Sequence, residues 1–231
     1  MKKETLHLLP SLHSIVDGIS GQAALCDFAS HTNAHPQTDN HRPFSALNKP
    51  NRYNIAGPNN IETLTVPVTQ KDKHNPINQV RINYNENWIK DHKQAWQTAY
   101  GKSPFFEHYD YRFWLILDAQ PVMLIDLIRP WNQLLFAKLG IPKDGLTGAF
   151  SSTNSNEPLD TAARSSETPA AETQSLVSQN TGVPIASYPQ VFDVKFGFRS
   201  EVSGIDLLFN QGPLAKEYLS QYVPTNTIFA P

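Results

Sequence analysis

The spacing of apolar residues changes near Trp88, and this change limits the folds open to the chain more than any other feature. Before Trp88, residues 62–68 ("ETLTVPV") and 77–84 ("INQVRINY") carry β-branched or alternating apolar side chains, as β-strands do. From Trp88 onward, apolar residues recur at three- and four-residue steps, which predicts a helix with one apolar face over residues 87–100. We therefore expect an α+β fold with N-terminal strands and a hairpin in a mixed sheet, followed by a mainly helical C-terminal half.

Shorter elements are expected in the N-terminal part. Residues 52–57 ("RYNIAG") precede the turn residues 58–60 ("PNN") and then a β-branched run, which predicts a hairpin. Residues 4–9 and 23–28 are short apolar runs of strand length. Between them, residues 11–19 are predicted to form a helix.

The C-terminal half contains several helix signals. Residues 109–139 are expected to be helical in two pieces, separated near Pro121 or Pro130, because proline interrupts helices. Ser203 and Asp206 have the spacing of a capping box and predict the start of a further helix.

The segment 151–181 consists mainly of small and polar residues and has no aromatic residue. Such a composition cannot bury enough apolar surface to offset its ordering entropy, so disorder is expected. The tail that follows has about fifty residues, which is marginal for an independent domain. We therefore expect a single domain over residues 1–231, interrupted by this loop, with residues 182–219 packing back on the first part.

Composition excludes several classes of protein. With 19 basic and 21 acidic residues, the net charge is −2, whereas nucleic-acid and anionic-membrane binders need a basic excess. No apolar stretch approaches the ~20 residues of a membrane span, and no signal-peptide pattern is present, so a cytoplasmic protein is expected. Cys26 is the only cysteine, which rules out an intramolecular disulfide.

Several motifs of cofactor and catalytic sites are absent from the sequence. It has no GxGxxG, Walker A, GxSxG or HExxH motif, and no cofactor is predicted. His31, His35 and His41 lie in a polar loop, with Asp39 between them. Their spacing is not a standard zinc signature, so no metal site is assigned, although a metal-dependent hydrolase stays an alternative.

Two stretches of the sequence resemble the WbqC-like protein family. Residues 51–109 contain Asn-Arg, a strand ending "TVPV", then Trp-x3-His and the aromatic "SPFF" segment, and residues 188–219 contain "SGIDLLFNQGP". The N-terminal "LLPSLH" lacks the tyrosine and second proline of the usual family turn. The resemblance implies a bacterial protein of surface-polysaccharide (O-antigen) biosynthesis, a transferase that moves an acyl or aminoacyl group to an amino sugar.

His92 is the candidate catalytic residue. It shares a predicted helical face with Trp88, itself a candidate substrate-binding residue, and histidine suits general-base work near neutral pH. The alternative is a histidine that packs in the helix and makes one hydrogen bond. Asn51 and Arg52 precede a strand, and the Arg52 guanidinium suits a phosphate or carboxylate, unless it forms a surface salt bridge. We expect Arg52 and His92 to border one cleft.

Three further residues are weaker candidates for substrate binding. Asp206 and Asn210 are four residues apart on one predicted helix, although capping and helix termination also explain them. His13 follows the first turn and could face the same cleft. The leading interpretation is a transferase acting on a small-molecule or nucleotide-sugar substrate, and the alternative is a non-catalytic binding or assembly protein of a polysaccharide pathway. The sequence does not indicate the oligomeric state.

Overall fold

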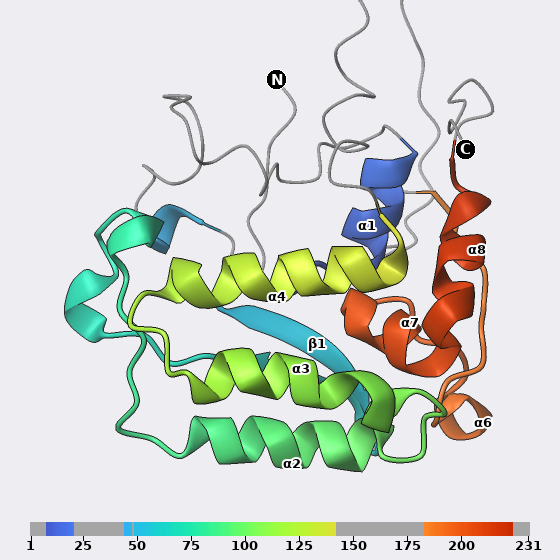
Figure 1. Cartoon of the computed structure of the whole chain (residues 1–231), viewed down its shortest axis with the longest axis horizontal. Coiled ribbons are helices and arrows are strands. Elements are labelled where there is room, and N and C mark those ends of the chain that lie inside the picture. The colour runs from blue at the N-terminus through green and yellow to red at the C-terminus, as the bar shows by residue number, and fades with distance from the viewer. Residues whose placement is uncertain (1–7, 21–43, 48, 142–182, 224–231) are drawn as a thin grey trace, which may run out of the picture.

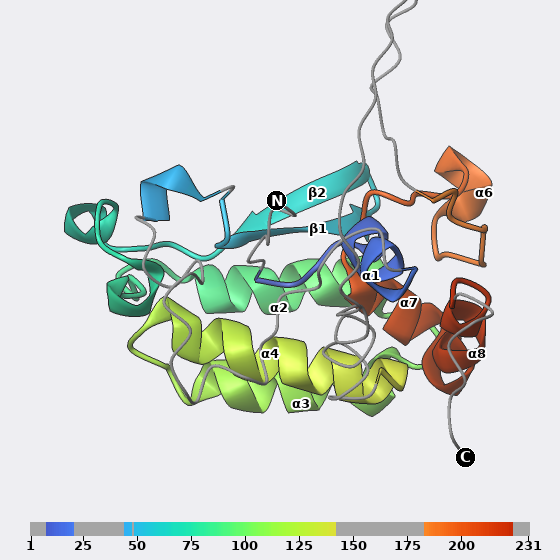
Figure 2. The same cartoon turned by 90° about the horizontal axis from the view of Figure 1, so that it is seen from above.

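The computed structural model describes residues 8–20, 44–47, 49–141 and 183–223. Three longer helices lie side by side, a β-hairpin covers one face of this layer, and shorter helices gather at one end (Figures 1 and 2). The strands are β1 (Arg52–Gly57) and β2 (Asn60–Thr65), and the α-helices are α1 (Leu12–Ile19), α2 (Trp88–Tyr100), α3 (Phe106–Asp118), α4 (Leu124–Leu139), α6 (Asp193–Phe196), α7 (Gly204–Gln211) and α8 (Ala215–Ser220).

The predicted hairpin is present, and the α+β class is confirmed. β1 and β2 pair in an antiparallel register that sets Arg52 opposite Thr65 and Gly57 opposite Asn60. Tyr53 and Ile55 of β1 are buried, and β1 contacts α2. The sheet of the described residues consists of this antiparallel pair.

The helix predicted over residues 87–100 is confirmed as α2. The break expected within residues 109–139 falls between α3 and α4, at the loop that contains Pro121. Pro130 lies inside α4 without ending it. Helix α1 begins where it was expected. Ser11 is its N-cap, and the Ser11 hydroxyl accepts a hydrogen bond from the Ser14 N–H at 3.1 Å.

Residues 77–84 do not form the predicted strand. A short 3-10 helix covers Ile77–Gln79, and single bridges follow, from Arg81 to Met123 and from Ile82 to Val68. Both neighbouring segments contain a proline, Pro67 on one side and Pro121 on the other. Proline has no N–H to donate, so neither ladder extends beyond one bridge.

The C-terminal helices pack against the N-terminal part of the chain. The Leu12 N–H donates to Val202 O at 2.8 Å, and the Gly204 N–H donates to Pro10 O at 2.9 Å. α7 contacts α1, α3 and α4, so this part of the expected return of residues 182–219 is confirmed. A Cβ added at Gly204 would lie 2.4 Å from Ile15 Cδ1, so a larger residue at this position would require the Ile15 side chain to shift.

The core is rich in aromatic residues. Trp96 of α2 lies at its centre, with ring centroids 5.9 Å from Trp131, 5.6 Å from Phe113 and 5.3 Å from Phe209. These partners come from α4, α3 and α7, so one cluster joins the four helices. All four rings are fully buried, and fully burying a side chain of this size stabilises by roughly 1.5–3 kcal/mol.

Several expected features lie outside the described residues. They are most of the strand expected at 4–9, the strand expected at 23–28 with Cys26, and the polar segment 151–181. The histidine loop with His31, His35, Asp39 and His41 also lies outside them. The interruption of a single domain by that segment stays a prediction.

Candidate anion-binding cavity

A cavity of about 340 Å³ opens at the end of the hairpin where Arg52 pairs with Thr65. This end lies away from α7 and α8 (Figures 1 and 2). The volume is in the range of small-molecule sites. Three segments supply the wall, and its residues are Phe44, Ser45, Leu47, Lys49, Asn51, Arg52, Thr65, Pro67, Val68, Gln70, Lys73, Asn83 and Glu86.

The charged side chains of the wall are mostly cationic. The wall contains three cations, Lys49, Arg52 and Lys73, and one carboxylate, Glu86. Among the described residues, none of the three cations has a side-chain hydrogen bond or ion pair. Cations gathered in a concave wall raise the local positive potential, although the whole chain carries a net charge of −2. The cavity is therefore suited to an anionic group.

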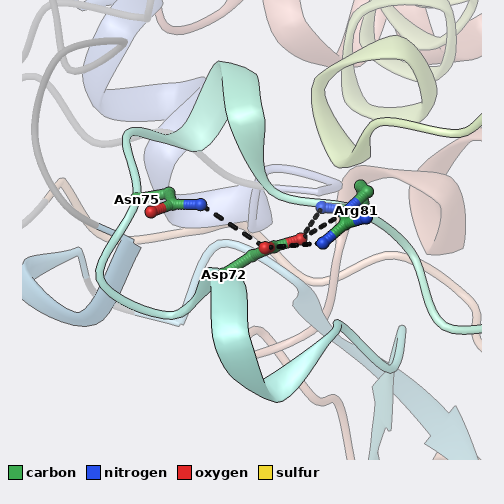
Figure 3. A network of polar contacts seen from close by, with 3 residues as sticks. All are labelled: Asp72, Asn75 and Arg81. Atoms are coloured by element: carbon green, nitrogen blue, oxygen red, sulfur yellow. Dashed lines mark hydrogen bonds and ion pairs between the residues drawn. The ribbon is translucent and has the colours of Figure 1, made fainter.

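The loop that carries Lys73 is fixed by a buried carboxylate (Figure 3). Asp72 accepts two bonds from the Arg81 guanidinium, from Nε at 2.8 Å and from Nη2 at 3.1 Å. It also accepts from the Arg81 N–H at 3.1 Å and from Asn75 Nδ2 at 3.4 Å. The hydrogen bonds from Arg81 lower the pKa of Asp72 below its usual value. The Asp72 carboxylate thus holds both ends of the loop together.

Asn51 has a structural partner as well as a place in the wall. Its Nδ2 donates to Val66 O at 2.7 Å, and its backbone oxygen accepts from the Val66 N–H at 2.9 Å. These two bonds extend the pairing of the strands one step beyond Arg52. Asn51 is buried, and Arg52 next to it is exposed to the cavity opening.

His92 lies behind the wall and is not among the residues that line the cavity. Its Nε2 is 3.2 Å from the carbonyl oxygen of Thr65, and its Nδ1 is 3.1 Å from the Tyr53 hydroxyl. Tyr53 in turn accepts from Trp96 Nε1 at 2.8 Å. A carbonyl can only accept, so Nε2 carries the ring proton and Nδ1 accepts from Tyr53. The expectation that Arg52 and His92 border one cleft is therefore wrong.

The protonation of His92 follows from this position. The side chain is buried, with 3% of the residue exposed, and this burial lowers the pKa of His92 to about 4. The hydrogen bond to Thr65 opposes the change only in part. The imidazole is neutral near pH 7, with both nitrogens hydrogen-bonded inside the protein.

Trp88 is also behind the wall. Its Nε1 donates to Asn83 O at 3.1 Å, and its ring contacts His92 edge-on, with centroids 5.2 Å apart. Trp88 therefore supports the segment that supplies Asn83 and Glu86.

Asp206 and Asn210 form a separate buried polar cluster. Asp206 Oδ2 accepts from the Tyr188 hydroxyl at 2.6 Å and from Gln190 Nε2 at 2.7 Å. Burial raises the pKa of Asp206 to about 6 despite these hydrogen bonds. Asn210 donates to Asp206 O at 2.9 Å and accepts from the Ser103 hydroxyl at 3.1 Å.

The predicted capping box at Ser203 is not formed by side chains. Ser203 is the N-cap of α7 by its backbone, but its hydroxyl makes no capping bond. Asp206 turns into the protein interior because Tyr188 and Gln190 supply hydrogen bonds there. His13 lies at the same end of the molecule, with Nδ1 3.1 Å from Ser200 O.

The structure thus divides the predicted site residues into groups. Asn51 and Arg52 line the cavity, His92 and Trp88 support its wall, and His13, Asp206 and Asn210 lie elsewhere. Sequence reasoning missed Lys49, Lys73 and Glu86, which lie in loops without a recognisable motif.

The described part of the chain has no metal-binding cluster and no membrane-spanning helix. No group of three or more His, Cys, Asp or Glu side chains there could hold a metal ion. None of the described helices has the length and apolar character to cross a membrane. The metal-dependent hydrolase interpretation depends on the histidine loop, which lies outside these residues.

A known protein family matches part of the sequence. A model of the WbqC-like protein family matches residues 40–160, which are 121 of the 231 residues. The chain belongs to the WbqC-like family. Comparisons with curated proteins and with solved structures gave no significant match. In this WbqC-like protein the matched range contains every residue of the cavity wall together with Trp88 and His92, whereas the Asp206 cluster lies beyond it.

Proposed function

We propose that this WbqC-like protein is a transferase that binds a phosphate-bearing nucleotide sugar in the cavity beside Arg52. In this proposal it moves an acyl or aminoacyl group to the amino sugar during bacterial surface-polysaccharide biosynthesis. One observation carries the binding part: Lys49, Arg52 and Lys73 line a single cavity and have no charged partner among the described residues.

The roles of the cations follow from their chemistry. The planar Arg52 guanidinium donates two parallel hydrogen bonds to a phosphate, and the lysines act as point charges. Thr65 and Asn83 add polar groups to the same wall. A cavity of about 340 Å³ takes part of a nucleotide sugar, so the remainder extends into solvent.

Glu86 is the wall residue best suited to the chemical step. In acyl transfer the amine nitrogen attacks the carbonyl carbon of an activated acyl donor, the new C–N bond forms, and the bond to the leaving group breaks. The nitrogen loses a proton, which the Glu86 carboxylate accepts and passes to the leaving group. His92 does not accept the amine proton in this proposal, because both of its ring nitrogens already have hydrogen-bond partners inside the protein.

A non-catalytic binding protein of the same pathway is the second candidate. The arrangement of His92 favours it, because the histidine proposed as a base from sequence does not line the cavity. Both candidates require anion binding, and they differ in whether a product forms.

Calorimetric titration with inorganic pyrophosphate and with UDP-N-acetylglucosamine tests the binding part. Arg52→Ala should weaken pyrophosphate binding about tenfold or more, since a hydrogen bond to a charged group is worth roughly 1.5–3 kcal/mol. Lys90→Ala, which removes an exposed cation outside the wall, is the matched control and should leave affinity unchanged. If the unmodified protein binds neither ligand, the proposal fails.

Product analysis then separates the two candidates. The protein is incubated with a nucleotide-linked amino sugar and with activated acyl or aminoacyl donors, and mass spectrometry detects the acylated sugar. Binding without any product across the donors would favour the binding protein.

A further inference from the structure

A hydrogen-bond relay connects the aromatic core to the cavity wall. Trp96 Nε1 donates to the Tyr53 hydroxyl at 2.8 Å, Tyr53 donates to His92 Nδ1 over 3.1 Å, and His92 Nε2 donates to Thr65 O over 3.2 Å. Trp96 is fully buried among rings from three helices, so the inner end of the relay is fixed. The outer end is a backbone atom of the wall.

The relay contacts the hairpin at two adjacent residue pairs, Arg52–Thr65 and Tyr53–Leu64. Thr65 is the register partner of Arg52, and Tyr53 follows Arg52 in β1. The relay therefore holds both strands at the place where the cavity opens. Two paired strands alone are marginally stable in water, so the position of the Arg52–Thr65 pair depends on contacts outside the hairpin.

We infer that His92 is a positioning residue of the anion site, whose Nε2–H fixes the Thr65 carbonyl and through it the Arg52–Thr65 pair. This inference rests on the proposed function of the cavity. It assigns His92 an effect on ligand affinity without any contact between the imidazole and the ligand.

The competing explanation is purely structural. Buried polar groups need hydrogen-bond partners, and the relay satisfies Trp96, Tyr53 and His92. If that were its whole role, a change at His92 would lower stability and leave the affinity of the folded protein unaltered. The two explanations therefore differ in the affinity measured on folded protein.

Two amide substitutions of His92 separate these explanations. The Nε2 of glutamine occupies nearly the position of the imidazole Nε2 and keeps a donor toward Thr65. Asparagine is one methylene shorter, so it places an acceptor near Nδ1 but does not reach Thr65. Both variants keep a polar side chain in the same pocket. Ser103→Ala is the control, because it removes a buried hydrogen bond to Asn210 away from the wall.

Pyrophosphate affinity, measured by calorimetry below each variant's unfolding temperature, is the first readout. His92→Gln should bind pyrophosphate within about twofold of the unmodified protein. His92→Asn should bind it at least about fivefold more weakly, because a loss of this size corresponds to one buried hydrogen bond. Ser103→Ala should bind normally. Equal affinity of the two His92 variants, or an equal loss in Ser103→Ala, would overturn the inference.

Amide hydrogen exchange without ligand is the second readout. Peptides that cover residues 51–66 should exchange faster in His92→Asn than in His92→Gln, with no change in Ser103→Ala. This result does not depend on ligand binding. If the unmodified protein does not bind pyrophosphate, the proposed function fails, whereas equal exchange in the two His92 variants contradicts the positioning role itself.

Discussion

The Asp72 carboxylate accepts two hydrogen bonds from the Arg81 guanidinium, at 2.8 and 3.1 Å, and so closes the loop that places Lys73 in the cavity wall (Figure 3). Asp72 is almost fully buried, whereas about half of the Arg81 side chain is exposed. The pair thus belongs to the architecture of the wall, and Arg81 is not a free cation for a ligand.

Asp72→Asn should loosen this loop. An amide keeps the shape but loses the charge that the guanidinium pairs with, so we expect a lower midpoint of thermal unfolding and pyrophosphate affinity reduced severalfold. Arg81→Lys keeps the positive charge but loses the planar guanidinium that donates two hydrogen bonds to Asp72, so it should lower the unfolding midpoint and the affinity less than Asp72→Asn does. Calorimetry measures both quantities, and normal affinity in Asp72→Asn would show that Lys73 does not depend on the pair.

The stability conferred by this pair should depend on pH in a defined direction. Because Arg81 lowers the pKa of Asp72 in the folded state, the contribution is present above the unfolded pKa of about 3.9 and is lost as pH falls through the lower folded value. Urea unfolding at pH 3 and pH 6 should show a smaller difference between Asp72→Asn and the unmodified protein at pH 3. An equal difference at both values would contradict the assignment.

His92 and Asp206 should give opposite pH dependences. The pKa of His92 is lowered to about 4 in the folded state, so the unfolded chain binds its proton more tightly. The contribution of His92 to the free energy of unfolding is therefore fully present above pH 6.5, and it decreases by about 3 kcal/mol as pH drops toward 4. His92→Gln should remove this dependence, and His74→Gln, at an exposed histidine, should retain it.

Asp206 behaves in the reverse sense. Its pKa is raised to about 6, so the folded protein binds the proton more tightly and loses about 3 kcal/mol as pH rises from 4 to above 6. Asp206→Asn should therefore be less damaging at pH 7.5 than at pH 4.5. In the unmodified protein the two effects nearly cancel, so urea unfolding of the variants is needed to reveal them.

Local patterns predicted the elements that depend on local spacing. The helix with Trp88 and His92 follows from four-residue steps, and the hairpin follows from a short run, a turn and then a β-branched run. The site depends on partners distant in sequence. Tyr53 is 39 residues from His92 and completes its hydrogen bonding, which no spacing rule reveals.

The remaining differences have similar causes. Asp206 has the spacing of a capping residue, but Tyr188 and Gln190 draw it into the interior. Lys73 and Glu86 reach the cavity because loops bring them there, and loops carry no periodic signal. Arg52 could be predicted because it stands at the start of a recognisable strand.

Glu86 provides a prediction in which binding and catalysis change in opposite directions. Its carboxylate lies in the wall with Lys49, Arg52 and Lys73, where it opposes their attraction for an anion. Glu86→Gln removes one negative charge at an exposed position, so pyrophosphate affinity should rise by about two- to fivefold at low salt. The gain should shrink as salt concentration increases.

Turnover should respond differently if Glu86 accepts the amine proton. Glutamine cannot act as a base, so kcat for acyl transfer should fall by about 10²-fold or more while KM for the nucleotide sugar stays equal or decreases. Lys90→Ala again serves as the control outside the wall. A variant with tighter pyrophosphate binding and unchanged kcat would remove Glu86 from the proton transfer and leave it a role in ligand discrimination alone. Weaker binding would instead mean that the carboxylate does not oppose the anion, and the charge arrangement proposed for the cavity would be wrong.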